Sequence, residues 1–292
     1  MYSNGLLEYY KKAYFKDGFL EVSKLKIKES DTQSIFDTCV SCKSPVGVFY
    51  KKCRNYFSKE MADAEILLSQ LYNRLGLTSA VYLPAREGKH KFLLSNSVNG
   101  KNIFQARIFN GFVSSKIGCE EELVTSFMNK QVYSSQEGEQ IVKYFSQRAL
   151  AQKIKMRVLD CAANNPDRED CNYVFKVDDN NIAQDIIVFD HERSGLESHR
   201  IVLERGLGCP TTGFCNDFGI ENASREEVLG QIKQSELCNE LVDRHALAQQ
   251  IGEVDVNDVA LDICRTTGYM IEPSYTDYIA KSFNLTANYL DK

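Results

Sequence analysis

The stretch from residue 159 to residue 175 reads LDCAANNPDREDCNYVF. Three aspartates, three asparagines and one arginine lie here between two short apolar flanks. Asp167 and Asn172 are separated by four residues, and the apolar segment NYVFKV, residues 172–177, begins directly at Asn172. A polar loop that leads straight into a β-strand is therefore the prediction from which the rest of the fold follows.

A second apolar segment, QDIIVFD at residues 184–190, follows this predicted strand. Between the two lie Asp178, Asp179, Asn180 and Asn181, residue types that favour tight turns. The pattern predicts a β-hairpin. Its open end would bring Asn172, which precedes one strand, close to Asp190, which ends the other.

This arrangement has a specific use in phosphoryl transfer. One carboxylate orients the attacking hydroxyl, while an amide and a second carboxylate hold the Mg²⁺ ions that neutralise the triphosphate. Protein kinases use the same loop spacing, which would make Asp167 the base and Asn172 and Asp190 the metal ligands. Asp160 and Asn165 repeat the spacing, but a proline rather than a strand follows Asn165, so we exclude this copy as the catalytic pair.

A kinase also needs a strand lysine for the phosphates and a helix glutamate to hold that lysine. The segment SPVGVFYKKC, residues 44–53, predicts a strand that supplies Lys51 or Lys52. The following helix, predicted over residues 58–77, supplies Glu65. The strand's alternation leaves the lysine open, and analogy with a V-A-I-K ending slightly favours Lys51.

The helix over residues 58–77 has clear end signals, since Ser58 suits an N-cap and Gly76 suits a left-handed C-terminal position. Residues 1–115 otherwise predict strands, whereas residues 116–292 predict helices interrupted by the polar hairpin. We therefore predict an α+β fold of two lobes, with the boundary at 115/116. The further expected strands are residues 80–85, 90–96 and 102–109, and the expected helical segments are 120–130, 135–163 and 221–292.

The loop and hairpin together resemble the HipA-like kinases, including the CtkA-type kinases, and type II phosphatidylinositol 4-kinases share a related loop. The helix AEILLSQLYNRLGL is also similar to the helix of that family, in which a glutamate precedes Leu-Gly-Leu. The resemblance covers about residues 40–200 and does not extend to the last 90 or so. The matching positions are Asp160, Asn165, Asp167, Arg168, Asn172 and Asp190.

The resemblance implies a protein-kinase-like fold that uses ATP and Mg²⁺ and phosphorylates a hydroxyl, foremost Ser or Thr of a protein, including the chain itself. A phosphoinositide or small-molecule kinase and a non-catalytic kinase-like binding protein are the alternatives. The implied roles are catalytic base for Asp167, Mg²⁺ ligands for Asn172 and Asp190, phosphate binding for Lys51 or Lys52 with Glu65, and loop bracing for Asp160 and Asn165.

Two segments depart from the family's pattern. The segment DTCVSCKSPVG before the lysine strand is poor in the glycines that usually let backbone N–H groups approach phosphates. Ser41, Lys43 and Ser44 would have to contact the phosphates with their side chains instead. His191 follows Asp190 where a small residue is usual, and we expect it to pack or hydrogen-bond near the metal. Asp170 is expected to be a solvated neighbour.

Bulk properties narrow the function further. The formal net charge of −5 argues against general nucleic-acid binding, which needs a basic surface. No stretch is apolar enough to cross a bilayer and the N-terminus is no signal peptide, so a cytoplasmic protein is expected, with export as an effector left open. The ten cysteines include a single CxxC at Cys39 and Cys42, and we expect buried, reduced thiols rather than zinc ligands.

Overall fold

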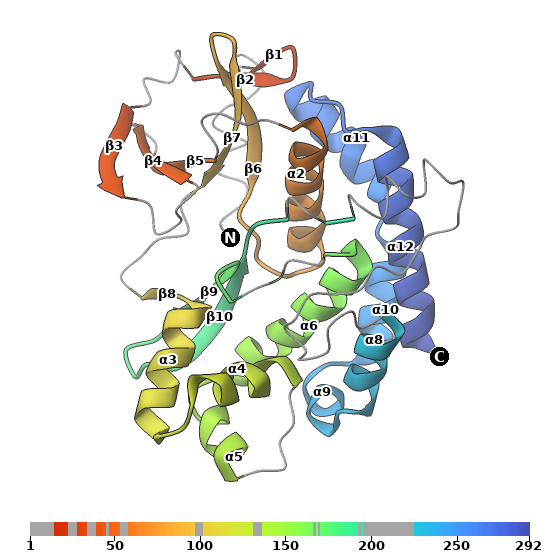
Figure 1. Cartoon of the computed structure of the whole chain (residues 1–292). Coiled ribbons are helices and arrows are strands. Elements are labelled where there is room, and N and C mark those ends of the chain that lie inside the picture. The colour runs from red at the N-terminus through yellow and green to blue at the C-terminus, as the bar shows by residue number, and fades with distance from the viewer. Residues whose placement is uncertain are drawn as a thin grey trace.

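The computed structural model has two sheets and a set of helices that lie mainly in the C-terminal part (Figure 1). In the strands between residues 28 and 52 only the backbone is described. The described residues are 15–22, 28–33, 39–44, 47–52, 58–96, 102–130, 136–165, 168, 170–191, 194–195 and 225–292.

The N-terminal part is built around a sheet in which seven strands are described, in the order β1-β2-β6-β7-β5-β4-β3. Neighbouring strands are antiparallel except β2 and β6, which run parallel because the chain crosses the sheet between them. The bounds are β1 Phe15–Lys16, β2 Phe19–Glu21, β3 Lys28–Gln33, β4 Cys39–Ser44, β5 Gly47–Lys52, β6 Tyr82–Glu87 and β7 His90–Asn96.

Helix α2, Lys59–Arg74, covers one face of this sheet. Its ends confirm the sequence signals, since the Ser58 side chain accepts a hydrogen bond from the Met61 backbone N–H, and Gly76 has a φ of 78°. Its apolar side chains share one core with Tyr82 and Leu93 of the sheet. The opposite face of the sheet carries a small separate core of Leu20, Val22, Ala85, Phe92 and Leu94.

A second sheet in the order β10-β9-β8 contains the predicted hairpin. Its strands are β8 Ile103–Gln105, β9 Tyr173–Val177 and β10 Ala183–Val188. The strand expected over residues 102–109 ends early, because helix α3, Ala106–Ile117, begins at Ala106. β8 pairs with β9 and not with the N-terminal sheet, so this strand belongs structurally with the hairpin.

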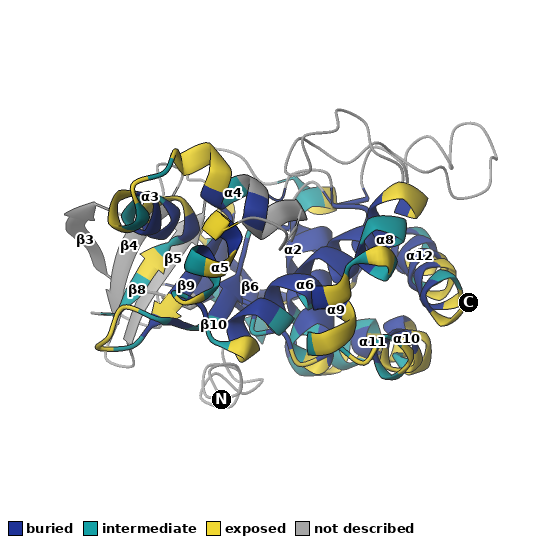
Figure 2. Ribbon diagram, turned by 90° about the horizontal axis from the view of Figure 1, so that it is seen from below, coloured by how far each residue is buried: buried dark blue, intermediate teal, exposed yellow. Residues whose placement is uncertain are grey.

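Helices form the remainder of the described C-terminal part, as the sequence predicts, but in shorter pieces. The expected helix over residues 135–163 is two helices, because Ser146 caps the second one by accepting from the Ala149 N–H. Figure 2 shows the buried residues of α2 and α6 in the middle of the molecule. The helices are α4 Glu121–Lys130, α5 Gln136–Val142, α6 Gln147–Ala163, α8 Arg225–Gln234, α9 Glu236–Leu241, α10 Arg244–Glu253, α11 Val256–Thr267 and α12 Pro273–Asp291.

Helix α2 lies between the N-terminal sheet and the C-terminal helices, with α11 beside it (Figure 1). The end of the hairpin bonds to the segment that follows α2, because Ala80 donates to the Val188 carbonyl and Val188 donates to the Thr78 carbonyl. Helix α2 therefore packs on the sheet, and the segment directly after it bonds to the hairpin. In the part of the chain that is described, no helix is long and apolar enough to span a membrane.

Candidate active site

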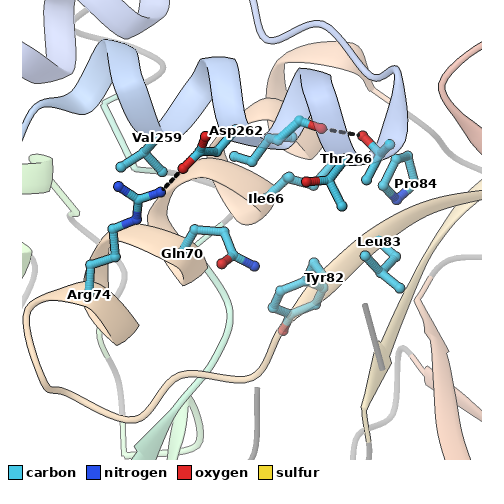
Figure 3. A pocket seen from close by; sticks show the side chains of 11 residues that line it. Ile66, Gln70, Arg74, Tyr82, Leu83, Pro84, Val259, Asp262 and Thr266 are labelled. Carbon is cyan, nitrogen blue, oxygen red and sulfur yellow. Dashed lines mark hydrogen bonds and ion pairs between the residues drawn. The ribbon is translucent and has the colours of Figure 1, made fainter. Parts of the chain in front are cut away.

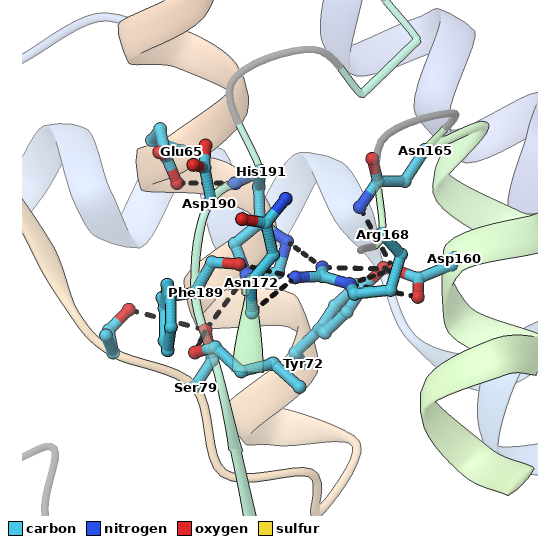
Figure 4. A network of polar contacts seen from close by, with 12 residues as sticks. Glu65, Tyr72, Ser79, Asp160, Asn165, Arg168, Asn172, Phe189, Asp190 and His191 are labelled. Carbon is cyan, nitrogen blue, oxygen red and sulfur yellow. Dashed lines mark hydrogen bonds and ion pairs between the residues drawn. The ribbon is translucent and has the colours of Figure 1, made fainter. Parts of the chain in front are cut away.

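Arg168 is the centre of a buried polar network beneath the hairpin (Figure 4). Its guanidinium forms a salt bridge with Asp160 at the end of α6, with an N···O distance of 3.1 Å. It also donates to the carbonyls of Asn172 and Phe189, one at each open end of the hairpin. One side chain thus ties α6 to both strands and fixes where the hairpin ends.

Asp160 is bound from several directions besides Arg168. The Tyr72 hydroxyl of α2 donates to its Oδ1 at 2.8 Å, and the Asn165 side-chain amide donates to the same oxygen at 3.1 Å. The Asn165 backbone N–H also donates to the Asp160 carbonyl. Asp160 and Asn165 are both buried. The two residues are thus bonded to each other by side chain and backbone, and the bracing role stays a prediction.

Burial and charge set the protonation of this network. Burial raises the pKa of Tyr72 well above 10, and the neighbouring Asp160 raises it further, so the hydroxyl remains a donor. Burial lowers the pKa of Arg168, but the charge and hydrogen bonds of Asp160, together with Tyr72 and Asp190, raise it by more, so the guanidinium stays charged. The Tyr72 hydroxyl therefore stays protonated and the Arg168 guanidinium stays charged across the physiological pH range.

His191 and Glu65 join the hairpin to α2. The His191 backbone N–H donates to Glu65 Oε2 at 2.8 Å, and both residues are fully buried. The His191 ring lies between Ser79 Oγ and the Arg168 guanidinium, at 3.0 and 3.1 Å, and packs edge-on against Tyr72. His191 is thus a buried residue that packs and hydrogen-bonds inside the network. Glu65 bonds to the backbone of the residue that directly follows Asp190.

Asn172 and Asp190 stand at the two open ends of the hairpin, beside Glu65 (Figure 4). Asn172 is buried, whereas Asp190 is partly exposed. The backbone of Asp190 adopts a left-handed conformation, with a φ of 63°, and its N–H donates to the Tyr82 hydroxyl at 3.2 Å. This unusual backbone is held in place by β6 on one side and by the Glu65–His191 bond on the other.

The donor set of Asn172 and Asp190 fits a magnesium ion. Mg²⁺ prefers oxygen ligands and is usually held by one or two protein groups, with waters and phosphates in its other positions. One carboxylate and one amide on a partly exposed edge supply that kind of incomplete set. Among the described residues, no group of three or more His, Cys, Asp and Glu side chains could hold a metal by itself.

Asp170 is not the solvated neighbour that we expected. Its carboxylate accepts from the Tyr173 hydroxyl at 2.7 Å, from the Asn110 amide at 2.9 Å and from the Thr125 hydroxyl at 3.2 Å. Lys153, which is 1% exposed, donates to the same Tyr173 hydroxyl. Asp170 therefore anchors the loop to α3 and α4, which contribute partners from distant parts of the sequence.

Several predicted site residues lie outside what the structure describes. Asp167 is outside the described residues. Lys51 and Lys52 end β5, and Ser41 and Ser44 lie in β4, but the side chains of all four are outside the description. The segment 39–44 forms a strand paired with β5 in place of the phosphate-covering loop that we expected before the lysine strand. The connection between β3 and β4, residues 34–38, is also outside the described part.

The cysteine expectation holds only in part. Cys161 and Cys238 are buried, and burial raises the pKa of the Cys161 thiol to about 12, so this thiol stays protonated. Cys171 is exposed instead, and its thiol donates to Asn172 Oδ1 at 3.3 Å. The thiol next to the hairpin thus touches the predicted metal ligand.

Three residues of the site had no recognisable sequence signal. Tyr72, Ser79 and Tyr82 contact Asp160, His191 and Asp190 respectively, but tyrosines and serines at these spacings are common in any helix or strand. Arg168 did have a signal. It is the only basic residue in the stretch 159–175, and its place between two acidic positions marks it as a salt-bridge partner.

The architecture has counterparts among solved structures, although no known family and no curated protein matches the sequence. The Helicobacter pylori proinflammatory kinase CtkA aligns with 94% of this chain and 97% of its own, at a TM-score of 0.61 and 12% identity. HipA of the Shewanella oneidensis toxin–antitoxin complex aligns with 90% of this chain and 66% of its own, at a TM-score of 0.42 and 9% identity. The chain therefore has a mixed α+β fold similar to the kinase-like fold of CtkA.

Proposed function

We propose that this protein is an ATP- and Mg²⁺-dependent kinase that transfers the γ-phosphate to a hydroxyl. The observation that carries the proposal is the meeting of three elements at one point. Glu65 of α2 accepts from the backbone N–H of His191 at 2.8 Å, directly after Asp190, while Arg168 fixes the other end of the hairpin at Asn172. Protein kinases need a helix glutamate that pairs with the strand lysine and two metal ligands in the same site.

The residues of the site would divide the work as follows. Asp167 would orient the acceptor hydroxyl and take up its proton, and Asn172 and Asp190 would hold Mg²⁺. Bound Mg²⁺ supplies positive charge that stabilises the charge on the transferring phosphoryl group. Asp160, Asn165 and the Arg168 network would keep the loop in place without touching the reactants. Ser41 and Ser44 remain candidates for phosphate contacts.

The strand register favours Lys52 over Lys51 as the phosphate lysine. Residues directly opposite each other in antiparallel strands share a face of the sheet. Lys52 lies opposite Leu93, which belongs to the core shared with α2, whereas Lys51 lies opposite Leu94 of the separate core on the other face. We therefore propose Lys52 as the partner of Glu65, which reverses the slight preference drawn from the sequence pattern.

The pairing of β8 with β9 supports a lobe boundary that differs from the one predicted from the sequence. Because β8 and α3 pack with the hairpin, we propose that the second lobe begins before residue 102 and not at residue 116. For the acceptor, we propose a serine or threonine hydroxyl of a protein, including this chain itself. The support is the fold shared with CtkA, which is a kinase.

Incubation of the purified protein with labelled ATP and Mg²⁺ tests the proposal. We expect phosphate on the chain or on an added protein, and we expect Asp167→Ala to abolish it. Lys52→Met should reduce transfer by at least about 100-fold, whereas Lys51→Met, a matched control on the same strand, should change it less than about threefold. Transfer that survives Asp167→Ala would refute the proposed base, and equal losses in both lysine variants would refute the register argument.

Product analysis separates the alternatives. Label on serine or threonine after partial hydrolysis identifies a protein kinase, whereas label on phosphoinositide vesicles or on a small molecule identifies another acceptor. Absence of both transfer and Mg²⁺-dependent stabilisation by ATP would leave a non-catalytic kinase-like protein.

A further inference from the structure

Helix α2 determines the geometry of the proposed site from two positions. Glu65 binds the backbone after Asp190, and Tyr72 binds Asp160. Any rotation or shift of α2 would therefore displace the hairpin end and the loop brace together. In protein kinases the position of this helix is a control point for activity. The contacts that hold α2 in place would therefore control the proposed reaction.

A buried carboxylate attaches the first half of α2 to the C-terminal helices. Asp63 is 1% exposed and accepts from the Tyr269 hydroxyl at 2.9 Å and from the Glu272 backbone N–H at 2.9 Å. Lys59, one turn earlier, contacts the same carboxylate at 2.7 Å and also donates to the Met270 carbonyl at 2.6 Å. The connection between α11 and α12 is therefore bonded directly to α2.

Tyr269 is itself fixed by the N-terminal strands. Its ring packs edge-on against Phe19 of β2, with centroids 5.8 Å apart. Gly18, at a φ of 82°, approaches so closely that a β-carbon there would lie 2.9 Å from the Tyr269 Cα. The hydroxyl that binds Asp63 is thus held by the sheet and by the C-terminal helices at once.

The last turn of α2 makes a second, more exposed attachment. Arg74 forms ion pairs with Asp258 and Asp262 of α11, with side chains that are 39 to 51% exposed. Between the two attachments lies a small pocket lined by residues of α2, β6 and α11, including Gln70, Tyr82 and Thr266 (Figure 3). Exposed ion pairs contribute little, so the buried Asp63 contacts dominate.

We propose that Asp63 is a positioning residue that locks α2 to the α11–α12 connection, so that Glu65 stays beside Asp190. The proposal rests on the proposed kinase function. Asp63 touches none of the reacting groups and acts through the helix that carries Glu65. The C-terminal helices, which lie beyond the sequence resemblance to known kinases, thereby gain a role in the site.

Tyr269→Phe tests this inference most directly. The variant removes the hydroxyl that binds Asp63 but keeps the ring that packs on Phe19. Tyr289→Phe is a matched control, because it removes a hydroxyl that binds the Glu226 carbonyl within the C-terminal helices, away from α2. Hydrogen exchange of α2 and of the His191 amide, together with kcat and KM for ATP, is measured in both variants.

We expect Tyr269→Phe to speed exchange in α2 and at His191 by about tenfold, the effect of losing one hydrogen bond to a carboxylate. We expect kcat to fall by a similar factor while KM for ATP stays within about twofold, because misplacement of a positioned group weakens the reaction step more than binding. Tyr289→Phe should leave exchange and kcat at wild-type values. Unchanged exchange in α2 after Tyr269→Phe would overturn the inference.

Two Asp63 variants test whether the acceptor oxygens of this side chain position α2. Asp63→Asn keeps one acceptor oxygen and should recover most of the activity that Asp63→Ala loses. Equal losses in the two variants would contradict a positioning role. If the wild-type protein transfers no phosphate to any acceptor, the proposed function fails, and the exchange measurements alone then decide whether Asp63 locks α2.

Discussion

Asp160 and Asp190 lie on either side of Arg168, yet the protein treats the two carboxylates in opposite ways. Asp160 is buried, and its oxygens accept from Tyr72, Asn165 and Arg168. Asp190 is partly exposed, its backbone has a φ of 63°, and its N–H donates to the Tyr82 hydroxyl. One aspartate is buried with its carboxylate inside a hydrogen-bonded network, and the other is partly exposed and has a left-handed backbone at the end of the hairpin.

This difference distinguishes a carboxylate that supports the fold from one that, in the proposed function, binds a metal. A carboxylate that closes a buried network contributes to stability, and its loss leaves a buried charge unpaired. In the proposed function, a carboxylate on a left-handed backbone at the edge of the site would bind the metal, and the surrounding contacts would offset the strain. The two aspartates should therefore respond differently to the same substitution.

The largest effect is expected for Asp190→Asn. Asparagine tolerates the left-handed backbone, so the fold should be retained, while the negative charge for Mg²⁺ is lost. We expect phosphotransfer to fall about 1,000-fold, with the free energy of unfolding changed by less than about 0.5 kcal/mol. Kinetic assays and urea titrations measure the two quantities. If Asp190→Asn lowered the free energy of unfolding as much as Asp160→Asn does, the proposed difference between the two aspartates would be wrong.

Asp160→Asn should reverse this outcome. Removing one partner of the buried pair with Arg168 is expected to lower the free energy of unfolding by about 3 kcal/mol. Arg148→Gln is the control, because it breaks an ion pair with Asp185 in which the arginine side chain is 67% exposed, and should cost less than about 0.5 kcal/mol. Similar small changes in both variants would mean that the buried network does not support the fold.

A smaller effect is expected for Tyr82→Phe, which removes the oxygen that accepts from the Asp190 N–H. A lost neutral hydrogen bond is worth about 1 kcal/mol, so we expect transfer to fall about fivefold. Higher Mg²⁺ concentrations should restore part of it, because the backbone around the metal ligand has loosened. Activity at the wild-type level would show that the left-handed turn at Asp190 does not depend on the Tyr82 hydroxyl.

The parts of the fold that local signals control were predictable from sequence. Ser58 and Gly76 mark the ends of α2, and both act through contacts within a few residues. The hairpin turn is also local, since Asp178 accepts from the backbone N–H groups of Asn180 and Ile182, and Asn181 has a φ of 61°. Because Asn172 and Asp190 flank this hairpin, their meeting followed from the turn.

What the sequence missed depends on distant partners. The segment 102–109 has apolar residues that suit a strand or a helix, and the choice is made by Phe109, which packs against Phe145 and Phe175 from other elements. Asp170 seemed solvated because its partners Asn110 and Thr125 lie 60 and 45 residues away. No local pattern records such contacts, so Tyr72, Tyr82 and the partners of Asp63 could not be found in advance either.

The bond between Lys59 and Met270 joins residues that are 211 positions apart. Long loops between contacting residues slow folding, because the chain must close them before the contact stabilises anything. A chain emerging from the ribosome would complete its first sheet and α2 long before residue 270 appears. The helix that carries Glu65 would then reach its final place only after the α11–α12 connection has been synthesised, so the proposed site would assemble later than the sheet beside it.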